Sequence, residues 1–185
     1  MKRRAALLLI APLSAVLAGC GGASDNAGAP ATSPAATASA STPAMPTVQP
    51  CDSLKPAALA KVLGYAETVH RGTAEAPSCA LTPAVKGGAS FNLNYQWWYQ
   101  GRLDDTLTAM AGNKGALSHI SVPGADSASL ITQVVKGKAA YVTGFVQNAK
   151  LVQMVNGIAE PHDVSTLTAA VTEILTQLSA GAPSA

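Results

Sequence analysis

Three segments with the composition of β-strands follow one another in the last third of the chain. They are Ser129 to Val135, Ala139 to Gln147 and Lys150 to Ile158, all rich in valine, isoleucine, threonine, tyrosine or phenylalanine. Only Lys136 to Lys138 and Asn148 to Ala149 separate them. Connections this short join antiparallel neighbours, because a parallel pair needs a crossover of about a dozen residues. We therefore expect an antiparallel sheet built around these hairpins.

Ala89 to Gln100 is the strongest single strand candidate. Its side chains alternate in character, as expected for a strand with one buried face and one exposed face. The predicted core face holds Phe91, Leu93, Tyr95, Trp97 and Tyr99, and the polar face holds Asn92, Asn94, Gln96, Trp98 and Gln100.

Apolar residues at helical spacing predict three helices. The first helix is capped by Asp52 or Ser53 and runs from Pro56 to Gly64, and the second is capped by Asp104 and runs to Asn113. The third is capped by Asp163 and has an apolar stripe of Val164, Leu167, Val171, Ile174, Leu175 and Leu178. Glu67 to Gly72 and Ser78 to Thr82 are weaker strand candidates, and a further extended segment is expected from Ser118 to Val122. The order of elements predicts an α+β fold: a curved antiparallel sheet of about five to six strands with helices packed on one face.

The N-terminus has the pattern of an export signal. Lys2 to Arg4 provide positive charge, an apolar run follows from Ala5, and Leu17-Ala18-Gly19 precedes Cys20. This ending resembles the lipobox of bacterial lipoproteins. The resemblance implies cleavage of residues 1–19, a diacylglycerol on the Cys20 sulfur, and an acylated amino terminus with chains such as palmitate. The alternative, an uncleaved membrane helix, needs about 20 apolar residues and is not favoured, because the run is short and interrupted.

Residues 20–50 form the lipidated cysteine and a tract of Gly, Ala, Ser, Thr and Pro that cannot build a core, so we expect a disordered tether. Residues 51–179 are long enough for a single α+β domain, and 180–185 form a disordered tail. Removing residues 1–19 takes away three of twelve basic residues and leaves nine against ten acidic ones, a formal charge of −1. A formal charge of −1 does not attract a phosphate backbone, so nucleic acid is not an expected partner.

Cys51 and Cys79 are the only cysteines that follow Cys20. Two thiols in an exported domain usually pair, and closing the loop between them would remove roughly 3 to 4 kcal/mol of unfolded-state entropy. A reactive or metal-binding thiol pair is the alternative, but it lacks the Cys-x-x-Cys spacing and nearby histidine ligands. We therefore expect a disulfide.

Several of these features occur together in one known family. The chain has a lipobox, a Pro/Ala/Thr-rich tether, Pro50-Cys51-Asp52-Ser53-Leu54, a helix ending Val62-Leu63-Gly64, a cysteine at Cys79 and a late Gly137-Lys138-Ala139-Ala140 hairpin. In this combination it resembles a family of actinobacterial lipoproteins with a domain of unknown function, the domain of unknown function 3558 family. The resemblance implies an envelope location and a disulfide. It brings no catalytic residues.

The sequence offers no recognisable catalytic motif, cofactor site or metal site. His70, His119 and His162 are far apart along the chain, and Asp104-Asp105 is explained by the predicted helix start. The more unusual feature is the polar face with Trp98, because an indole framed by amides suits a sugar or a peptide. A partly covered face, or one isolated exposed ring, is the alternative interpretation.

We therefore expect a non-enzymatic lipoprotein, anchored to the cell membrane with its domain on the extracytoplasmic side. Its expected role is to bind an envelope protein, glycan or lipid through Asn92, Asn94, Gln96, Trp98 and Gln100. A structural lipoprotein that acts through assembly with another envelope protein is the alternative. A hydrolase with an unrecognised site would need a His, Asp and Ser cluster in a deep pocket.

Overall fold

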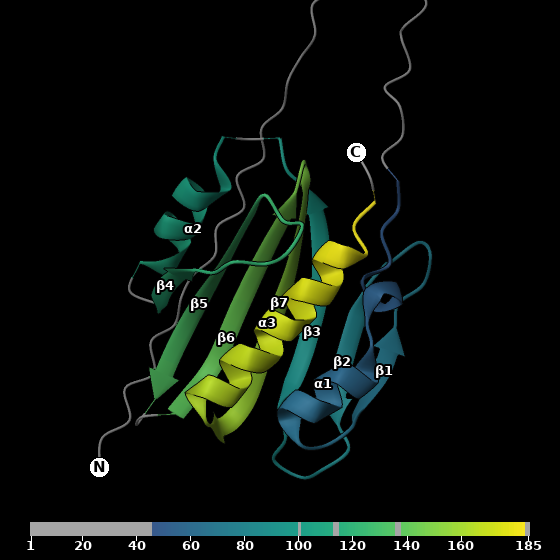
Figure 1. The fold of residues 1–185 in the computed structure, drawn as a ribbon, viewed down its shortest axis with the longest axis vertical. Helices are drawn as coiled ribbons and strands as arrows, with labels where there is room; N and C mark the ends of the chain where they lie inside the picture. Colours follow the sequence, from purple (N-terminus) through teal and green to yellow (C-terminus); the bar gives the residue numbers. More distant parts are fainter. Residues whose placement is uncertain (1–45, 100, 113–114, 136–137, 184–185) are drawn as a thin grey trace, which may run out of the picture. The chain divides into compact units, whose positions relative to one another are not determined.

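The computed structural model describes residues 46–99, 101–112, 115–135 and 138–183 (Figure 1). The predicted signal segment 1–19, Cys20, most of the predicted tether 20–50, Gln100 and the end of the predicted tail 180–185 lie outside the described residues. Among the described residues, no helix is long and apolar enough to cross a membrane.

The sheet has seven strands in the order β1-β2-β3-β7-β6-β5-β4, and all neighbouring pairs are antiparallel. The strands are β1 (Glu67–Arg71), β2 (Cys79–Pro83), β3 (Ser90–Trp97), β4 (Ala116–His119), β5 (Ser127–Val135), β6 (Lys138–Asn148) and β7 (Leu151–His162). The predicted α+β class and antiparallel sheet are confirmed. The strand number exceeds the prediction of five to six because the short segment at Ala116–His119 also pairs, along the edge of β5.

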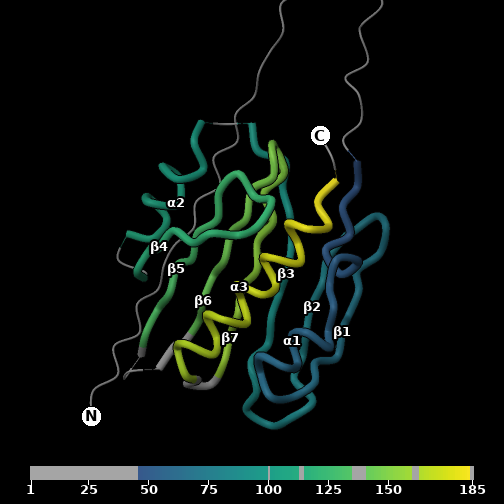
Figure 2. Tube along the Cα trace, in the orientation of Figure 1, coloured from purple at the N-terminus to yellow at the C-terminus, as the bar shows by residue number. Residues whose placement is uncertain are grey.

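Two runs of hairpins meet in the middle of the sheet. β3 pairs with β7 along its whole length, from Ser90 opposite Ile158 to Trp97 opposite Leu151. Figure 2 shows these two strands side by side, although they are far apart in the sequence. β7 is paired with both β3 and β6, whereas β2 pairs only with Phe91–Leu93 of β3, so Asn94–Trp97 have a strand partner on one side only among the described residues. β1 and β4 are the edge strands of the sheet.

Two helices cover one face of the sheet. α1 (Pro56–Leu63) follows the 3-10 turn η1 (Pro50–Ser53), and α3 (Val164–Ala180) crosses in front of β6 and β7 in Figure 1. The predicted stripe of α3 is buried: Leu167, Val171, Ile174, Leu175 and Leu178 are each 0% exposed and join one core with Phe91 and Leu93. Burial of large apolar side chains on this scale is the main stabilising contribution to such a fold.

α3 lies unusually close to β6 at Gly144. A Cβ atom placed there would lie 2.6 Å from Val171 Cγ1 and 2.8 Å from Leu175 Cδ1. Both distances are too short for carbon atoms to tolerate without movement. The glycine therefore allows the helix to rest directly on the strand.

Only one of the three predicted helix caps is confirmed. Asp163 accepts hydrogen bonds from the backbone N–H groups of Ser165 and Thr166, at 2.9 and 3.1 Å. The caps predicted at Asp52 or Ser53 and at Asp104 are wrong. The cap residue of α1 is Lys55, and that of α2 (Leu103–Ala111) is Arg102, so the first-turn acids of α2 lie within the helix.

The helix α2 packs on the face opposite α1 and α3, unlike the prediction of one helix-covered face. Its residues Leu103, Leu107 and Ala111 form a second cluster with Ile131, Phe145 and Val152 of three strands. These strand residues alternate with Leu130, Val146 and Val155 of the main core. Because side chains alternate across a strand, both faces of β5, β6 and β7 are apolar at this end, and α2 covers the second face.

The predicted disulfide between Cys51 and Cys79 is confirmed. It joins η1 to the first residue of β2, and the two residues are 1% and 2% exposed. Asp52, beside Cys51, forms an ion pair with Arg71 at the end of β1. The start of the domain is therefore fixed covalently to β2, the strand next to the sheet edge.

Candidate functional site

A strip of exposed amide side chains runs along β3 on the same sheet face as α2. Asn92, Asn94 and Gln96 are exposed, and we call these three residues the amide face. Phe91 and Leu93 alternate with them and are 0% and 2% exposed. The alternation predicted from the sequence is therefore present in this part of the strand.

The neighbouring strands extend the polar surface beyond β3. Asn92 lies opposite Asn156 of β7, which in turn lies opposite Thr143 of β6. The Thr143 hydroxyl donates a hydrogen bond of 2.9 Å to Asn156 Oδ1. This contact fixes the orientation of the Asn156 amide and leaves its NH₂ group as a donor.

Trp98 lies just after β3, on the sheet face that carries α2 and the amide face, and it is partly covered there. β3 ends at Trp97, and Trp98 is half-buried beside the cluster under α2. Its backbone N–H donates to the carbonyl of Lys150 at 2.6 Å, and its indole N–H donates to the carbonyl of Gly101 at 3.3 Å. The ring is thus held in place by the chain around it, with part of its surface exposed.

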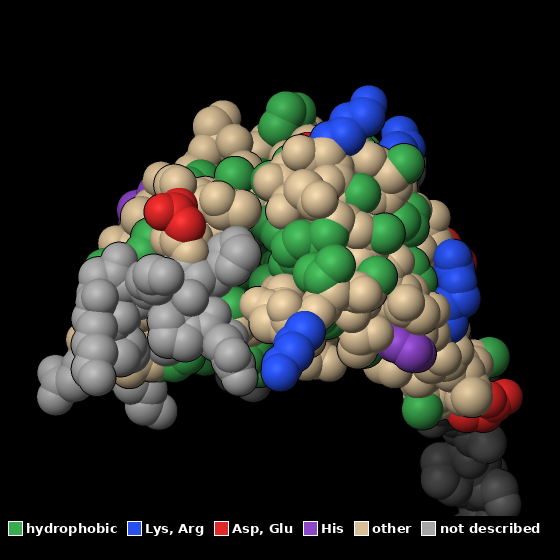
Figure 3. All heavy atoms as spheres, turned by 90° about the horizontal axis from the view of Figure 1, so that it is seen from below, with side chains coloured by type: hydrophobic (Ala, Val, Ile, Leu, Met, Phe, Trp, Pro, Cys, Tyr) green, Lys and Arg blue, Asp and Glu red, His purple; other side chains and the backbone are tan. Residues whose placement is uncertain are grey.

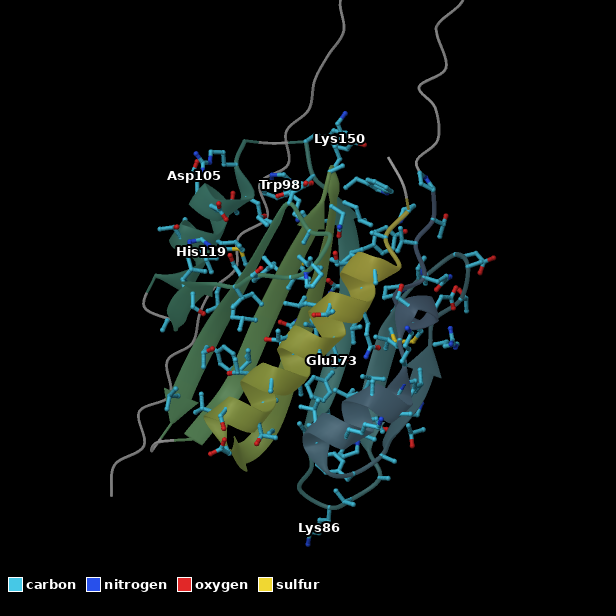
Figure 4. All side chains as sticks on the ribbon, viewed as in Figure 1. Lys86, Trp98, Asp105, His119, Lys150 and Glu173 are labelled. Atoms are coloured by element: carbon cyan, nitrogen blue, oxygen red, sulfur yellow. A yellow bond between two sulfur atoms is a disulfide. The ribbon has the colours of Figure 1, made fainter. Side chains whose placement is uncertain are left out.

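Tyr99 is not a core residue, and this part of the prediction is wrong. The side chain is 56% exposed, and the Lys150 ammonium lies 5.2 Å from the centre of its ring. The strand geometry that would have turned Tyr99 inward ends two residues earlier, at Trp97. Figure 4 shows Trp98 and Lys150 at the end of the sheet where β6 turns into β7, with Lys86 at the opposite end.

Two cavities, each of about 280 Å³, lie at this end of the sheet. The first, the Trp98 pocket, is lined by Gln96, Trp97, Trp98 and Tyr99. The second, the Asp104 pocket, is lined by Gly101, Arg102, Leu103, Asp104, Asp126, Ser127 and Gln147. The indole N–H of Trp98 donates to Gly101, so one hydrogen bond joins the lining of the two cavities.

The β6–β7 turn supports the far side of the Asp104 pocket. One carboxylate oxygen of Asp126 accepts from the backbone N–H of Ala149 at 2.6 Å. The Gln147 amide donates to the Ala149 carbonyl at 2.9 Å. Ala149 has a φ of 51°, a left-handed conformation that is uncommon for a residue with a side chain. These contacts hold Asp126 and Gln147 in defined positions at the cavity.

Asp104 has spare capacity to accept hydrogen bonds. Its Oδ1 atom is buried and has no hydrogen-bond partner among the described residues. Its other oxygen lies 3.8 Å from Arg102 Nη2, beyond hydrogen-bond distance. Oδ1 is closed to solvent, and the Nδ1 atom of His119 lies 3.9 Å from it.

The comparisons with known proteins identify the chain at the level of a family. A model of the family described as proteins of unknown function, DUF3558, matches residues 15–142, which is more than half of the sequence. The chain belongs to the DUF3558 family. No curated protein and no solved structure matches it.

The DUF3558 domain brings together a histidine, an aspartate and a serine, but not in the geometry of a catalytic triad. His119 Nδ1 lies 3.0 Å from Ser129 Oγ and 3.9 Å from Asp104 Oδ1. A triad needs the carboxylate and the nucleophile on different ring nitrogens, so that one orients the ring while the other loses its proton. Ser129 is also only 1% exposed, which keeps its hydroxyl away from a substrate.

His70 lies at the opposite edge of the sheet from this cluster. His70 is exposed on β1, where its Nε2 lies 2.8 Å from the Thr82 hydroxyl. The side chain of His162 is outside the described part of the structure. Within the described residues, no group of three or more His, Cys, Asp or Glu side chains is arranged to hold a metal ion.

Charged side chains are sparse on the DUF3558 domain surface. Figure 3 shows single Lys, Arg, Asp and Glu side chains scattered over the face seen from below, among uncharged and hydrophobic ones.

Sequence reasoning found the amide face but missed the Asp104 pocket. The lining of that cavity comes from three separate segments, at 101–104, at 126–127 and at Gln147. Asp104 itself was interpreted as a helix cap, and nothing in the sequence marked Asp126. The one available signal was Trp98, because its position beside amides indicated where to look.

Proposed function

We propose that this protein is an exported lipoprotein, anchored through Cys20, whose domain is a non-catalytic binding module for a component of the cell envelope. The observation that carries the proposal is the exposed amide face beside two open pockets at the same end of the sheet. Exposed amides offer both donors and acceptors, and half-exposed aromatic rings offer flat apolar area. Together they are typical of recognition surfaces.

The fold supports this role by its stability. Asn92, Asn94 and Gln96 lie on a strand that is paired with β7 along its whole length, and the opposite face of that strand is in the core. Side chains on such a strand are held more firmly than those on a loop. A rigid surface of this kind loses little entropy when it binds a ligand.

The non-catalytic assignment is supported by the geometry around His119. Ser129 and Asp104 approach the same ring nitrogen, and the serine is buried. A hydrolase that uses these groups would require a different arrangement of the ring.

Anchoring predicts a clear change in location for Cys20→Ser. The wild-type protein is expected in the membrane fraction, because two or more acyl chains make membrane residence long-lived. The variant cannot accept the diacylglycerol and is expected to leave that fraction. Cell fractionation with immunoblotting measures the difference. A Cys20→Ser protein that stays fully membrane-bound would contradict the proposed anchor.

The binding role predicts that Asn94→Ala combined with Gln96→Ala loses envelope partners. The two side chains are exposed, so their removal leaves the core intact and abolishes several hydrogen bonds to a ligand. Recovery of partners is measured by chemical cross-linking of whole cells and affinity purification of the full-length protein. The matched control is Lys86→Ala, an exposed loop residue at the opposite end of the sheet from Trp98.

For these variants, we expect the control to recover partners as the wild type does, and the amide-face variant to recover at most about a tenth, since each lost hydrogen bond costs roughly 1 kcal/mol. Equal recovery by both variants would contradict recognition at this face. Matching melting temperatures of the variants show that any loss does not come from unfolding.

A further inference from the structure

We propose that α2 is a lid that opens as a unit while the rest of the domain stays folded, and that its opening uncovers an apolar strip beside the amide face. The inference goes beyond the proposed function, because it holds whichever component the amide face binds. It is carried by the contacts that hold α2 in place, by a buried oxygen that its closed position leaves without a partner, and by the residues beneath the helix.

Few side chains attach α2 to the sheet. Its three buried residues are Leu103, Leu107 and Ala111, and the cluster that they form with the strands shares no residue with the main core. The helix α3, by contrast, has eight buried residues, and its large apolar side chains are part of the main core. Detachment of α2 therefore leaves the main core in place.

Polar contacts add little to the attachment of α2. The Thr108 hydroxyl donates within the helix, to the Asp104 carbonyl. On the neighbouring strand β4, His119 Nδ1 is 3.9 Å from Asp104 Oδ1, which is beyond hydrogen-bond distance. The helix α3 is held differently, because the Gln153 amide of β7 donates to its Leu178 carbonyl at 2.9 Å. The attachment of α2 thus depends mainly on its apolar side chains.

The closed position of α2 has a cost at Asp104. Its Oδ1 atom is closed to solvent and has no hydrogen-bond partner among the described residues. A buried carboxylate oxygen without a donor is unfavourable, because it has lost its hydration and gained nothing in return. Opening of α2 returns this oxygen to water. The gain offsets part of the apolar contact that holds the helix closed.

The backbone at both ends of α2 suits such a movement. Gly101 precedes the helix with a φ of 53°, and Gly112 follows it with a φ of 37°. Glycine exchanges between positive and negative φ without the steric cost that a Cβ atom imposes. Residues at the ends of an element, often small ones, absorb the backbone change when a lid moves.

The surface beneath α2 continues the amide face across the sheet. Asn94 lies opposite Met154, which lies opposite Phe145 on the next strand, and Gln96 lies opposite Val152. Phe145 and Val152 are 2% and 0% exposed in the closed state, where they pack in the cluster under α2. Opening of α2 therefore adds apolar surface directly beside exposed amides. Recognition surfaces commonly combine an apolar centre with polar surroundings.

Hydrogen–deuterium exchange of the purified protein, followed by mass spectrometry, tests the lid. A helix of nine residues does not persist alone once it detaches, so its amides exchange when it opens. We expect protection factors in α2 to be at least about 100-fold lower than in α3, because they report local opening instead of global unfolding. Low concentrations of urea should change the exchange of α2 little, because local opening exposes little surface.

Leu107→Ala and Met110→Ala form a matched pair of variants in the same helix, since Leu107 is 1% exposed and Met110 is 51% exposed. We expect Leu107→Ala to lower the protection of α2 by about tenfold or more and to leave that of α3 within about twofold of the wild type. Met110→Ala should change neither helix.

Asp104→Ala and Asp105→Ala test the buried oxygen. Both residues lie in the first turn of α2, where an acidic side chain interacts favourably with the helix dipole, so both variants lose that contribution. Asp105 is exposed, whereas Asp104 buries an oxygen without a partner. We expect α2 to be protected about tenfold more in Asp104→Ala than in Asp105→Ala, since the first variant also removes the buried oxygen.

Three outcomes would overturn the inference. The first is equal protection of α2 and α3 in the wild type. The second is a Leu107→Ala protein in which both helices lose protection alike, because α2 would then unfold only with the whole domain. The third is α2 no better protected in Asp104→Ala than in Asp105→Ala. None of them affects recognition at the amide face, whose side chains are exposed while α2 is closed. The recovery of partners from cells tests that function separately.

Discussion

Replacing Cys51 and Cys79 together by alanine is expected to lower the free energy of unfolding by about 3 to 4 kcal/mol. The disulfide closes a loop with a sequence separation of 28, and removing it returns the corresponding entropy to the unfolded chain. Alanine is the suitable replacement, because both positions are almost fully buried and a serine hydroxyl there would need a partner. The melting temperature should fall by roughly 10 °C, measured by circular dichroism.

The wild-type protein under reducing conditions is the control for this prediction. It should lose the same stability as the double alanine variant, whereas reduction should not affect the variant. Labelling of the unfolded, unreduced domain with a thiol reagent should find no reactive group at either cysteine. Two labelled thiols, or a variant as stable as the wild type, would contradict the structural role of the bond.

The second large effect is expected at Glu67, a buried acid at the start of β1. Its side chain is 8% exposed, and neither carboxylate oxygen has a hydrogen-bond partner among the described residues. Burial raises the pKa of Glu67 to about 7, because the charged form loses its hydration. The folded state therefore binds a proton at this site more tightly than the unfolded state does.

The raised pKa fixes the sign of the pH dependence. Below the ordinary pKa of 4.5 the Glu67 carboxyl is protonated in both the folded and the unfolded state, so folding does not have to bury a charge and the domain has its full stability. As the pH rises from 4.5 through 7, the unfolded state loses its proton first and the domain loses stability. The total change is at most about 3 kcal/mol, since each unit of pKa corresponds to about 1.4 kcal/mol.

Glu67→Gln removes this dependence and keeps the shape of the side chain. We expect the variant to be more stable than the wild type by about 2 to 3 kcal/mol at pH 8, and by little or nothing at pH 4. Urea unfolding at a series of pH values measures the difference. Glu75→Gln, at an exposed loop position, is the control: hydrogen bonds with the backbone and Thr73 lower the pKa of Glu75, so any pH trend of this variant should have the opposite sign. A stability difference for Glu67→Gln that stays constant from pH 4 to pH 8 would contradict a buried, titrating carboxyl.

The sequence predicted the positions of the strands and helices better than it predicted which side of each one is buried. Phe91 and Leu93 alternate with Asn92 and Asn94 because the two sides of β3 meet different surroundings, and this contrast is visible in the residue types. The alternation fails at Tyr99, because β3 ends at Trp97 and the exposed Tyr99 ring lies under the Lys150 ammonium instead of in the core. Such a tertiary contact leaves no local pattern in the sequence.

The place of α2 could not be derived from its own residues. An apolar stripe shows that a helix packs on something, but not on which face of a sheet. The signal was in the strands instead, where Leu130 and Ile131 are consecutive and both buried, as are Phe145 and Val146. Consecutive buried residues indicate that both faces of a strand are covered.

The candidate site shows the same division. The amide face came from one strand and was found, whereas the Asp104 pocket comes from three segments and depends on loop conformation. The burial of Glu67 had a weak signal in the sequence, since Glu67 lies two residues before the partly buried Val69 and therefore on the same face of the strand. The absence of a partner for its carboxylate is a property of the fold.

The most direct measurement of the binding role is a site-specific photocross-link in living cells. A photoreactive phenylalanine analogue replaces Asn94 in the full-length protein, and in a control it replaces the exposed Lys86 at the other end of the sheet. We predict a discrete cross-linked product from position 94 that is absent from position 86. No product from position 94, or the same products from both positions, would contradict recognition of an envelope ligand at this face.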